Sequence, residues 1–107
     1  MKEETSVQNA IKIALCKKGC VVHRKNVGKF YTLDGRLITI GTLGHSDLYG
    51  HTPQGKAFYI EVKTPTKKPS KDQKRFLKAM HESGAISGVA KSADDAIEIV
   101  FGGANEL

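Results

Sequence analysis

A carboxylate and an ammonium group, Glu61 and Lys63, stand in the largely apolar segment FYIEVKT at residues 58–64. Side chains alternate between the two faces of a strand, so both charged groups project to one side while Ile60 and Val62 project to the other. Ionised groups resist burial unless they are paired or bound to a cation. The segment is therefore either an edge strand with a weak surface ion pair or a strand that carries a reactive site.

A second carboxylate, Asp47, precedes the turn signal at residues 53–55, which folds its run back onto the run that contains Glu61. The two carboxylates can then converge on one divalent cation, with the Val62 carbonyl as a candidate third ligand. Oxygen ligands favour Mg²⁺ or Mn²⁺ over zinc. Such a cation can polarise a phosphate and activate water. Lys63 can orient the nucleophile and stabilise charge, or act as a base if its pKa falls substantially.

Short strands that position these groups are predicted from hydrophobic periodicity and turn signals. The dipeptide Asp34-Gly35 suits a two-residue hairpin turn between the second and third strands. A proline-bearing loop follows Lys63. The predicted strands are Val21-Val22, Phe30 to Leu33, Arg36 to Ile40, the run around Asp47 to Tyr49, Ala57 to Lys63, and Ile86 to Ala90.

Three helices complete the predicted fold. The first has apolar residues at helical spacing and ends before Gly19, a natural stop. Ser70 and Gln73 form a capping-box signature for the second helix, and Ser92 with Asp95 can cap the last one. The order helix, strands, helix, strand, helix predicts an α/β fold, in which a mixed central sheet is flanked by helices in one domain over residues 1–107.

Charge and targeting signals narrow the functional classes. Lys and Arg number 17 against 11 Asp and Glu, a net charge of +6, which favours a nucleic-acid partner; the alternative is a basic surface kept for solubility. Neither a membrane-spanning run nor a secretory signal is visible, so we expect a cytoplasmic protein without membrane association. Cys16, Cys20 and His23 lack a fourth ligand at a zinc spacing, which favours reduced thiols.

The order and spacing of these pieces resemble the VRR-NUC domain of the PD-(D/E)xK nuclease superfamily over nearly the whole chain. Asp47 takes the place of the motif's Asp, and Glu61-Val62-Lys63 takes the place of its E-x-K. One departure is Ala90-Lys91, where the family name denotes an Arg-Arg pair after Val. The supporting pieces are E-x-x-V-Q at Glu4 to Gln8, R-K-N-V-G at Arg24 to Gly28, G-H-S-D-L at Gly44 to Leu48, I-E-V-K at Ile60 to Lys63, D-Q at Asp72-Gln73, and G-V-A-K-S at Gly88 to Ser92.

The resemblance implies a restriction-endonuclease-like fold and a stand-alone nuclease of the phage or bacterial type. It implies Mg²⁺ (or Mn²⁺) as cofactor, with no small-molecule cofactor, and a homodimer that cuts branched DNA such as four-way (Holliday) junctions. Flap or splayed-duplex cutting stays open. The alternative is a non-catalytic nucleic-acid-binding module, or a subunit of a recombination or repair complex. The presence of Glu4, Asp47, Glu61 and Lys63 together argues against that alternative.

The resemblance also assigns roles to residues. Glu4 reaches the metal centre from the first helix, with Glu3 as a rival at that position, and Lys63 assists catalysis. Gln73 lies near the site in the family, but it is equally well explained here as the capping-box residue. The implied catalytic residues are Glu4, Asp47, Glu61, Lys63 and Gln73, and the implied metal ligands are Glu4, Asp47, Glu61 and Val62.

Basic residues bracket the expected site and are candidates for contacts with DNA phosphates, or else a solvated face. His45 and His51 flank Asp47 and are interpreted as surface or turn histidines. The candidate DNA-binding residues are Arg24, Lys25, Lys29, Lys67, Lys68, Lys71, Lys74, Arg75 and Lys91.

Overall fold

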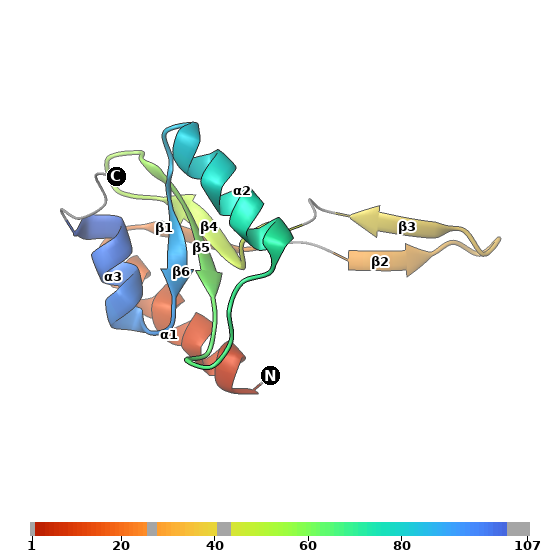
Figure 1. Cartoon of the computed structure of the whole chain (residues 1–107), viewed down its shortest axis with the longest axis horizontal. Coiled ribbons are helices and arrows are strands. Elements are labelled where there is room, and N and C mark those ends of the chain that lie inside the picture. Colours follow the sequence, from red (N-terminus) through yellow and green to blue (C-terminus); the bar gives the residue numbers. More distant parts are fainter. Residues whose placement is uncertain (1, 26–27, 41–43, 103–107) are drawn as a thin grey trace.

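The structure, a computed structural model, describes residues 2–25, 28–40 and 44–102 of the 107-residue chain, with only the backbone described at residues 2–3, 28–30 and 38–40. The predicted order of helix, strands, helix, strand and helix is confirmed (Figure 1). In chain order the elements are α1 (Lys2–Lys17), β1 (Val21–Arg24), β2 (Gly28–Tyr31), β3 (Leu37–Ile40), β4 (Leu48–His51), β5 (Ala57–Val62), α2 (Lys71–Glu82), β6 (Ile86–Ala90) and α3 (Ala93–Phe101).

The main sheet has the strand order β1-β4-β5-β6. The β1–β4 and β4–β5 pairs are antiparallel, whereas β5 and β6 are parallel and are joined by the crossover helix α2. A parallel pair requires such a crossover, because a tight turn can only reverse the chain direction. The sheet is therefore mixed, as predicted from the sequence.

Helices cover both faces of this sheet. In Figure 1, α2 lies on one side of it, while α3 and α1 lie on the other. The second side holds the core, where Phe58, Ile60 and Val62 of β5 pack in one cluster with Ile11 and Leu15 of α1, and each of the five is 0% exposed. Burial of each such side chain is worth about 1.5–3 kcal/mol. We call this side the core face and the side under α2 the site face.

Local signals fix where the helices begin and end. The Ser70 hydroxyl accepts a hydrogen bond from the Gln73 N–H at 3.2 Å, and the Gln73 side chain accepts one from the Ser70 N–H at 2.8 Å, so the predicted capping box is confirmed. Gly19 and Gly84 follow α1 and α2 in the left-handed region, with φ of +87° and +102°.

Within the described part of the chain, no helix is long and apolar enough to cross a membrane.

The β2–β3 hairpin corrects one prediction. Its strand pairing ends at Tyr31 opposite Leu37, and the Thr32 N–H then donates to the Arg36 carbonyl at 2.8 Å. The loop is therefore longer than the two-residue turn expected at Asp34-Gly35. A two-residue type I′ turn needs positive φ at both central residues. Here only Gly35 has positive φ, at +87°, so the longer loop leaves Asp34 unstrained.

The same hairpin extends away from the main sheet, along the long axis of the molecule (Figure 1). The principal dimensions of the chain are 51 × 31 × 27 Å. Three apolar side chains of the hairpin are exposed, namely Tyr31 at 75%, Leu33 at 110% and Leu37 at 51%. The hairpin thus carries apolar surface outside the core.

Candidate active site

The two carboxylates predicted to converge do lie side by side. Leu48 of β4 pairs with Ile60 of β5, so the preceding Asp47 lies across from Glu61. The Val62 N–H donates to Asp47 Oδ2 at 2.9 Å, which fixes the Asp47 side chain against the end of β5. The turn between the two strands thus brings together the two acids that the sequence singled out.

Glu61 is buried without a hydrogen-bond partner. Its side chain is 1% exposed, and neither Oε1 nor Oε2 accepts a hydrogen bond from the described residues. The Lys63 ammonium lies 3.2 Å from Oε2, close enough for an ion pair although the two groups are not oriented for a hydrogen bond. Unsatisfied buried carboxylate oxygens are costly, so this position is explained by a ligand better than by stability.

The electrostatic environment of Glu61 opposes its ionisation. Burial, reinforced by the negative charge of Asp47, raises the pKa of Glu61 from 4.5 to about 7, although the Lys63 ammonium acts in the opposite direction. A strongly perturbed carboxyl group in a cluster of charged side chains is typical of functional sites. A cation between the two carboxylates would remove the repulsion that raises this pKa.

Lys25 is the second cation at the pair. Its ammonium lies 3.4 Å from Asp47 Oδ1 and 3.5 Å from the carbonyl oxygen of His45. The Lys25 N–H also donates to the Asp47 carbonyl at 2.9 Å, which continues the β1–β4 pairing. The sequence placed Lys25 among the phosphate contacts and gave no sign of this pairing, because the distance between β1 and β4 along the chain hides their register.

The loop before Asp47 passes directly beneath the first turn of α2. Gly44 has φ of +78°, and a Cβ atom there would lie 2.5 Å from the carbonyl oxygen of Asp72. Only glycine permits both this backbone conformation and this close approach. The helix that covers the site face is thereby seated on the segment that carries the first carboxylate.

Other predicted site residues are not drawn into this pair. Glu4 is half-buried near the start of α1, and no three His, Cys, Asp or Glu side chains among those described gather closely enough to hold a metal ion. The side chain of Glu3, the rival to Glu4, lies outside the described residues. The Gln73 carboxamide oxygen is engaged in the cap of α2. Cys16 is exposed and Cys20 is buried, and both are free thiols.

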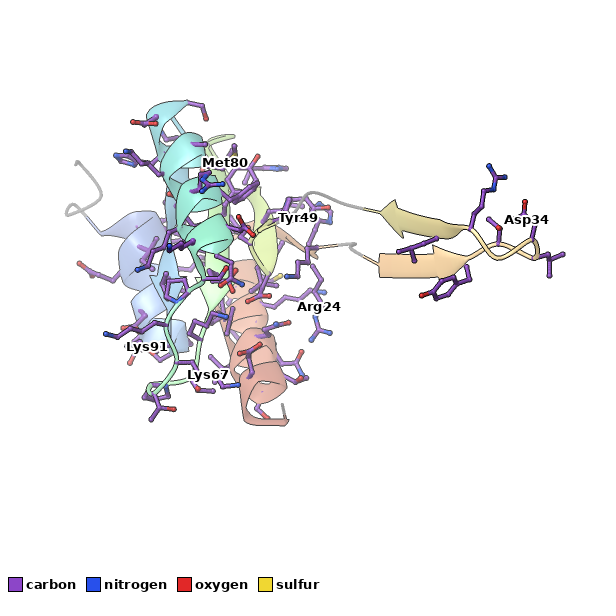
Figure 2. The ribbon with its side chains drawn as sticks, turned by 45° about the vertical axis from the view of Figure 1, so that its right-hand side comes forward. Arg24, Asp34, Tyr49, Lys67, Met80 and Lys91 are labelled. Atoms are coloured by element: carbon purple, nitrogen blue, oxygen red, sulfur yellow. The ribbon has the colours of Figure 1, made fainter. Side chains whose placement is uncertain are left out.

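The predicted DNA contacts lie on several surfaces. Arg24, labelled in Figure 2, donates to the Asn9 side chain of α1, so it lies on the core face, whereas Lys25 lies against Asp47 on the site face. The side chain of Lys29 lies outside the described residues. A surface pocket of about 500 Å³ at the outer edge of β6 is lined by residues that include Lys67 and Lys91, but by neither carboxylate of the pair. The remaining candidates, Lys68, Lys71, Lys74 and Arg75, are exposed.

The two histidines flanking Asp47 have different settings. His51 is exposed, as expected of a surface residue. His45 follows the turn at Gly44 and is half-buried, and its ring lies 4.6 Å from that of Phe76 on α2, a contact that the interpretation as a surface or turn histidine did not include. The packing arises because Gly44 brings α2 over this loop, a contact that has no local sequence signal.

A mixed sheet flanked by helices, with a buried carboxylate pair beside a lysine at the end of a central strand, defines a restriction-endonuclease-like protein. The sequence profile of the VRR-NUC domain matches residues 2–94. The chain therefore belongs to the VRR-NUC family of nucleases. A solved structure described as a VRR_NUC domain shares the fold, with a TM-score of 0.66 and 24% identity over 92% of this chain and 94% of that one. A comparison with curated proteins found no match.

Proposed function

We propose that this nuclease is a divalent-metal-dependent DNA endonuclease whose reaction takes place at the Asp47–Glu61 pair. The observation that carries the proposal is the unsatisfied carboxylate of Glu61, 1% exposed and beside a second acid and a lysine. A charged pair of this kind destabilises the fold in the absence of a ligand. A bound cation supplies the missing partner.

The donor set fits a hard cation. Asp47 and Glu61 offer carboxylate oxygens, and the Val62 carbonyl is the third ligand in the proposal. Glu4, half-buried on α1, is proposed as a further ligand, although its side chain is not gathered with the pair among the described residues. Oxygen donors of this kind select Mg²⁺ or Mn²⁺, which retain bound water alongside protein ligands.

Bound there, the cation supplies Lewis-acid activation of a phosphodiester and lowers the pKa of its water. The Lys63 side chain is 15% exposed, and its ammonium, 3.2 Å from Glu61 Oε2, can hold the attacking water or stabilise charge on the phosphate. Lys25, against Asp47, holds that carboxylate in place. Five exposed basic residues are proposed to contact DNA phosphates: Lys67 and Lys68 of the loop after β5, and Lys71, Lys74 and Arg75 in the first half of α2.

Branched DNA and a homodimer are the finer parts of the proposal. The described residues offer one such carboxylate pair, so cutting two strands of a four-way junction calls for two copies. The exposed apolar side chains of the β2–β3 hairpin support association, because contiguous exposed apolar surface commonly marks an interface. Sedimentation at several protein concentrations, with Leu33→Ser as the test variant, should show a dimer that the substitution weakens.

The cleavage test uses labelled four-way junction, flap, splayed and linear DNA with Mg²⁺, Mn²⁺ or EDTA. Asp47→Asn, Glu61→Gln and Lys63→Ala should each abolish cutting that depends on metal, and EDTA should abolish it in the wild type. Lys78→Ala and Glu82→Gln, exposed changes on α2, are the matched controls and should cut normally. Mg²⁺ should also raise the melting temperature of the wild type but not of Glu61→Gln.

Two outcomes would contradict the proposal. DNA binding without cutting of any substrate in either metal would favour the non-catalytic binding module. Cutting that persists in Glu61→Gln and in EDTA would show that the reaction takes place elsewhere on the chain.

A further inference from the structure

A row of aromatic rings crosses the site face next to the carboxylate pair. The register pairs His23 of β1 with Tyr49 of β4, and Tyr49 with Tyr59 of β5, so the three side chains lie in line across three strands. The ring centroids of His23 and Tyr49 are 5.3 Å apart, and those of Tyr49 and Tyr59 are 6.5 Å apart with an interplanar angle of 18°. The rings therefore form one row of neighbouring contacts across the three strands.

Helix α2 covers only one end of this row. It packs on β5 and β6, and its Phe76 ring lies 5.5 Å from that of Tyr59. At the other end, His23 is exposed, whereas Tyr49 is half-buried and has the edge of the His45 ring 5.1 Å from its own. Figure 2 shows Tyr49 beside α2, and the register puts it in the same row as His23, on the opposite face from Arg24. The row is thus open at His23 and at the part of Tyr49 that His45 leaves uncovered, while the Tyr59 end belongs to a small core.

The next row along the same face holds the candidate catalytic groups. Lys25 comes two residues after His23, just beyond the end of β1. Asp47 comes two residues before Tyr49, just before β4, and Glu61 comes two residues after Tyr59 on β5. Neighbouring residues on one face of a strand are roughly 7 Å apart. A phosphate held at the carboxylate row therefore places its own or an adjacent nucleotide within reach of the open rings.

Open aromatic rings beside positive charge bind unpaired nucleic acid, because exposed bases stack on rings and the backbone is attracted by nearby cations. Bases within a duplex are already stacked on one another and cannot use such a surface. A cross-strand ring pair can also serve the sheet alone, where it contributes less than about 1 kcal/mol. The closeness of Lys25, 35% exposed, to the ring row favours the first role.

We propose that His23 and Tyr49 form a stacking platform for an unpaired base next to the cleavage site. This inference rests on the proposed nuclease function and specifies it: the preferred DNA has unpaired nucleotides beside the cut, whereas a continuous duplex lacks the base that the platform holds. The platform is a binding site and takes no part in the bond-breaking step.

The test measures binding in EDTA, so that it is independent of cleavage. The two probes are a splayed duplex with 2-aminopurine as its first unpaired base and a fully paired duplex of the same sequence. Tyr49→Ala and His23→Ala should each weaken binding of the splayed probe by about tenfold and reduce quenching of 2-aminopurine, with little effect on the paired probe. Tyr49→Phe keeps the ring and should bind as the wild type does.

Phe101→Ala, which removes an exposed ring from α3, is the matched control and should leave both measurements unchanged. If Tyr49→Ala fails to fold, the exposed His23→Ala variant still decides. Equal losses on both probes, or none on either, would overturn the platform. If ring-dependent quenching is seen but no DNA is cut, the platform stands and the nuclease proposal fails. If DNA is cut in a metal-dependent way but neither alanine variant changes binding or quenching, the nuclease proposal stands and the platform fails.

Discussion

Three side chains on the two faces of strand β5 are almost equally buried but contribute to stability with opposite sign. Phe58 and Ile60 point to the core face, and Glu61 points to the site face. Phe58 and Ile60 are 0% exposed and Glu61 is 1% exposed. The apolar side chains gain from leaving water, whereas the carboxylate loses its hydration and finds no hydrogen-bond partner.

This difference gives a reason why the strand that carries Glu61 is so apolar on its other side. Folding stability is a small difference between large terms, so an unfavourable buried charge must be offset nearby. The core face of β5 offsets it within the same strand. This comparison between the two faces can be tested by substitutions at four places in the fold, taken in order of expected effect.

Truncating a side chain of the core face should have the largest effect on the free energy of unfolding. Phe58→Ala deletes a ring that is 0% exposed and leaves a cavity among the residues of α1 and β4, so the free energy of unfolding should fall by about 3–5 kcal/mol. Urea denaturation measures this change. Tyr31→Ala, at a position that is 75% exposed, should change stability by less than about 0.5 kcal/mol. Similar losses for both variants would contradict the assignment of the core.

Replacing the Glu61 carboxylate of the site face by a neutral group should stabilise the folded chain, by an amount that depends on pH. The pKa of Glu61 rises from 4.5 to about 7 on folding, so between these values the folded chain retains a proton that the unfolded chain releases. The free energy of unfolding without metal therefore falls as the pH rises from about 4.5 to 7, by roughly 3 kcal/mol in total, and stays low above that range.

Glu61→Gln should remove this contribution, and the variant should be the more stable protein at pH 8 but not at pH 4. Urea denaturation in EDTA at both pH values measures the difference, with Glu82→Gln, an exposed change, as the control. If the wild type is as stable as Glu61→Gln at pH 8, the Glu61 carboxylate has a hydrogen-bond partner that the structure does not contain.

Disturbing the contact between the loop at Gly44 and the first turn of α2 should have an intermediate effect on stability. Gly44→Ala combines an unfavourable φ of +78° with a Cβ atom 2.5 Å from the Asp72 carbonyl oxygen, so it should cost roughly 2 kcal/mol and reduce cleavage. Gly35→Ala is the matched control, since Gly35 has φ of +87° but no atom near its missing Cβ. Equal stability losses and equal cleavage in the two variants would refute the seating of α2 on this loop.

The smallest effect should come from the cap of α2. Ser70→Ala and Gln73→Ala each remove one of the two capping hydrogen bonds, and each should lower the free energy of unfolding by about 1 kcal/mol without changing cleavage. Thermal melts and the cleavage assay together test this. Loss of cutting in Gln73→Ala but not in Ser70→Ala would instead assign Gln73 to the active site.

The sequence predicts those parts of the fold whose signals are local. The capping box at Ser70, the glycine that ends α1 and the turn between β4 and β5 each depend on a few neighbouring residues, and all three are confirmed. The same turn also sets the register that brings Asp47 to Glu61. The carboxylate pair was therefore predictable because its two members lie on adjacent strands of one hairpin.

Features that depend on distant packing were not predictable. The pairing of Lys25 with Asp47 requires the β1–β4 register, and the burial of His45 requires α2 to close over its loop. The ring row of His23 and Tyr49 has the same origin. Alternation within each strand shows which residues share a face, but the sequence does not say which residue of β1 lies opposite which residue of β4.

The β2–β3 hairpin also divides the chain into two complementary pieces. A tryptic cut after the exposed Arg36 would leave α1 and β1 in one fragment, and Asp47, Glu61 and Lys63 together in the other. The two fragments share the β1–β4 ladder and the core between α1 and β5. The hairpin tip is thus a natural split point, where a nuclease could be made dependent on the reassembly of its halves.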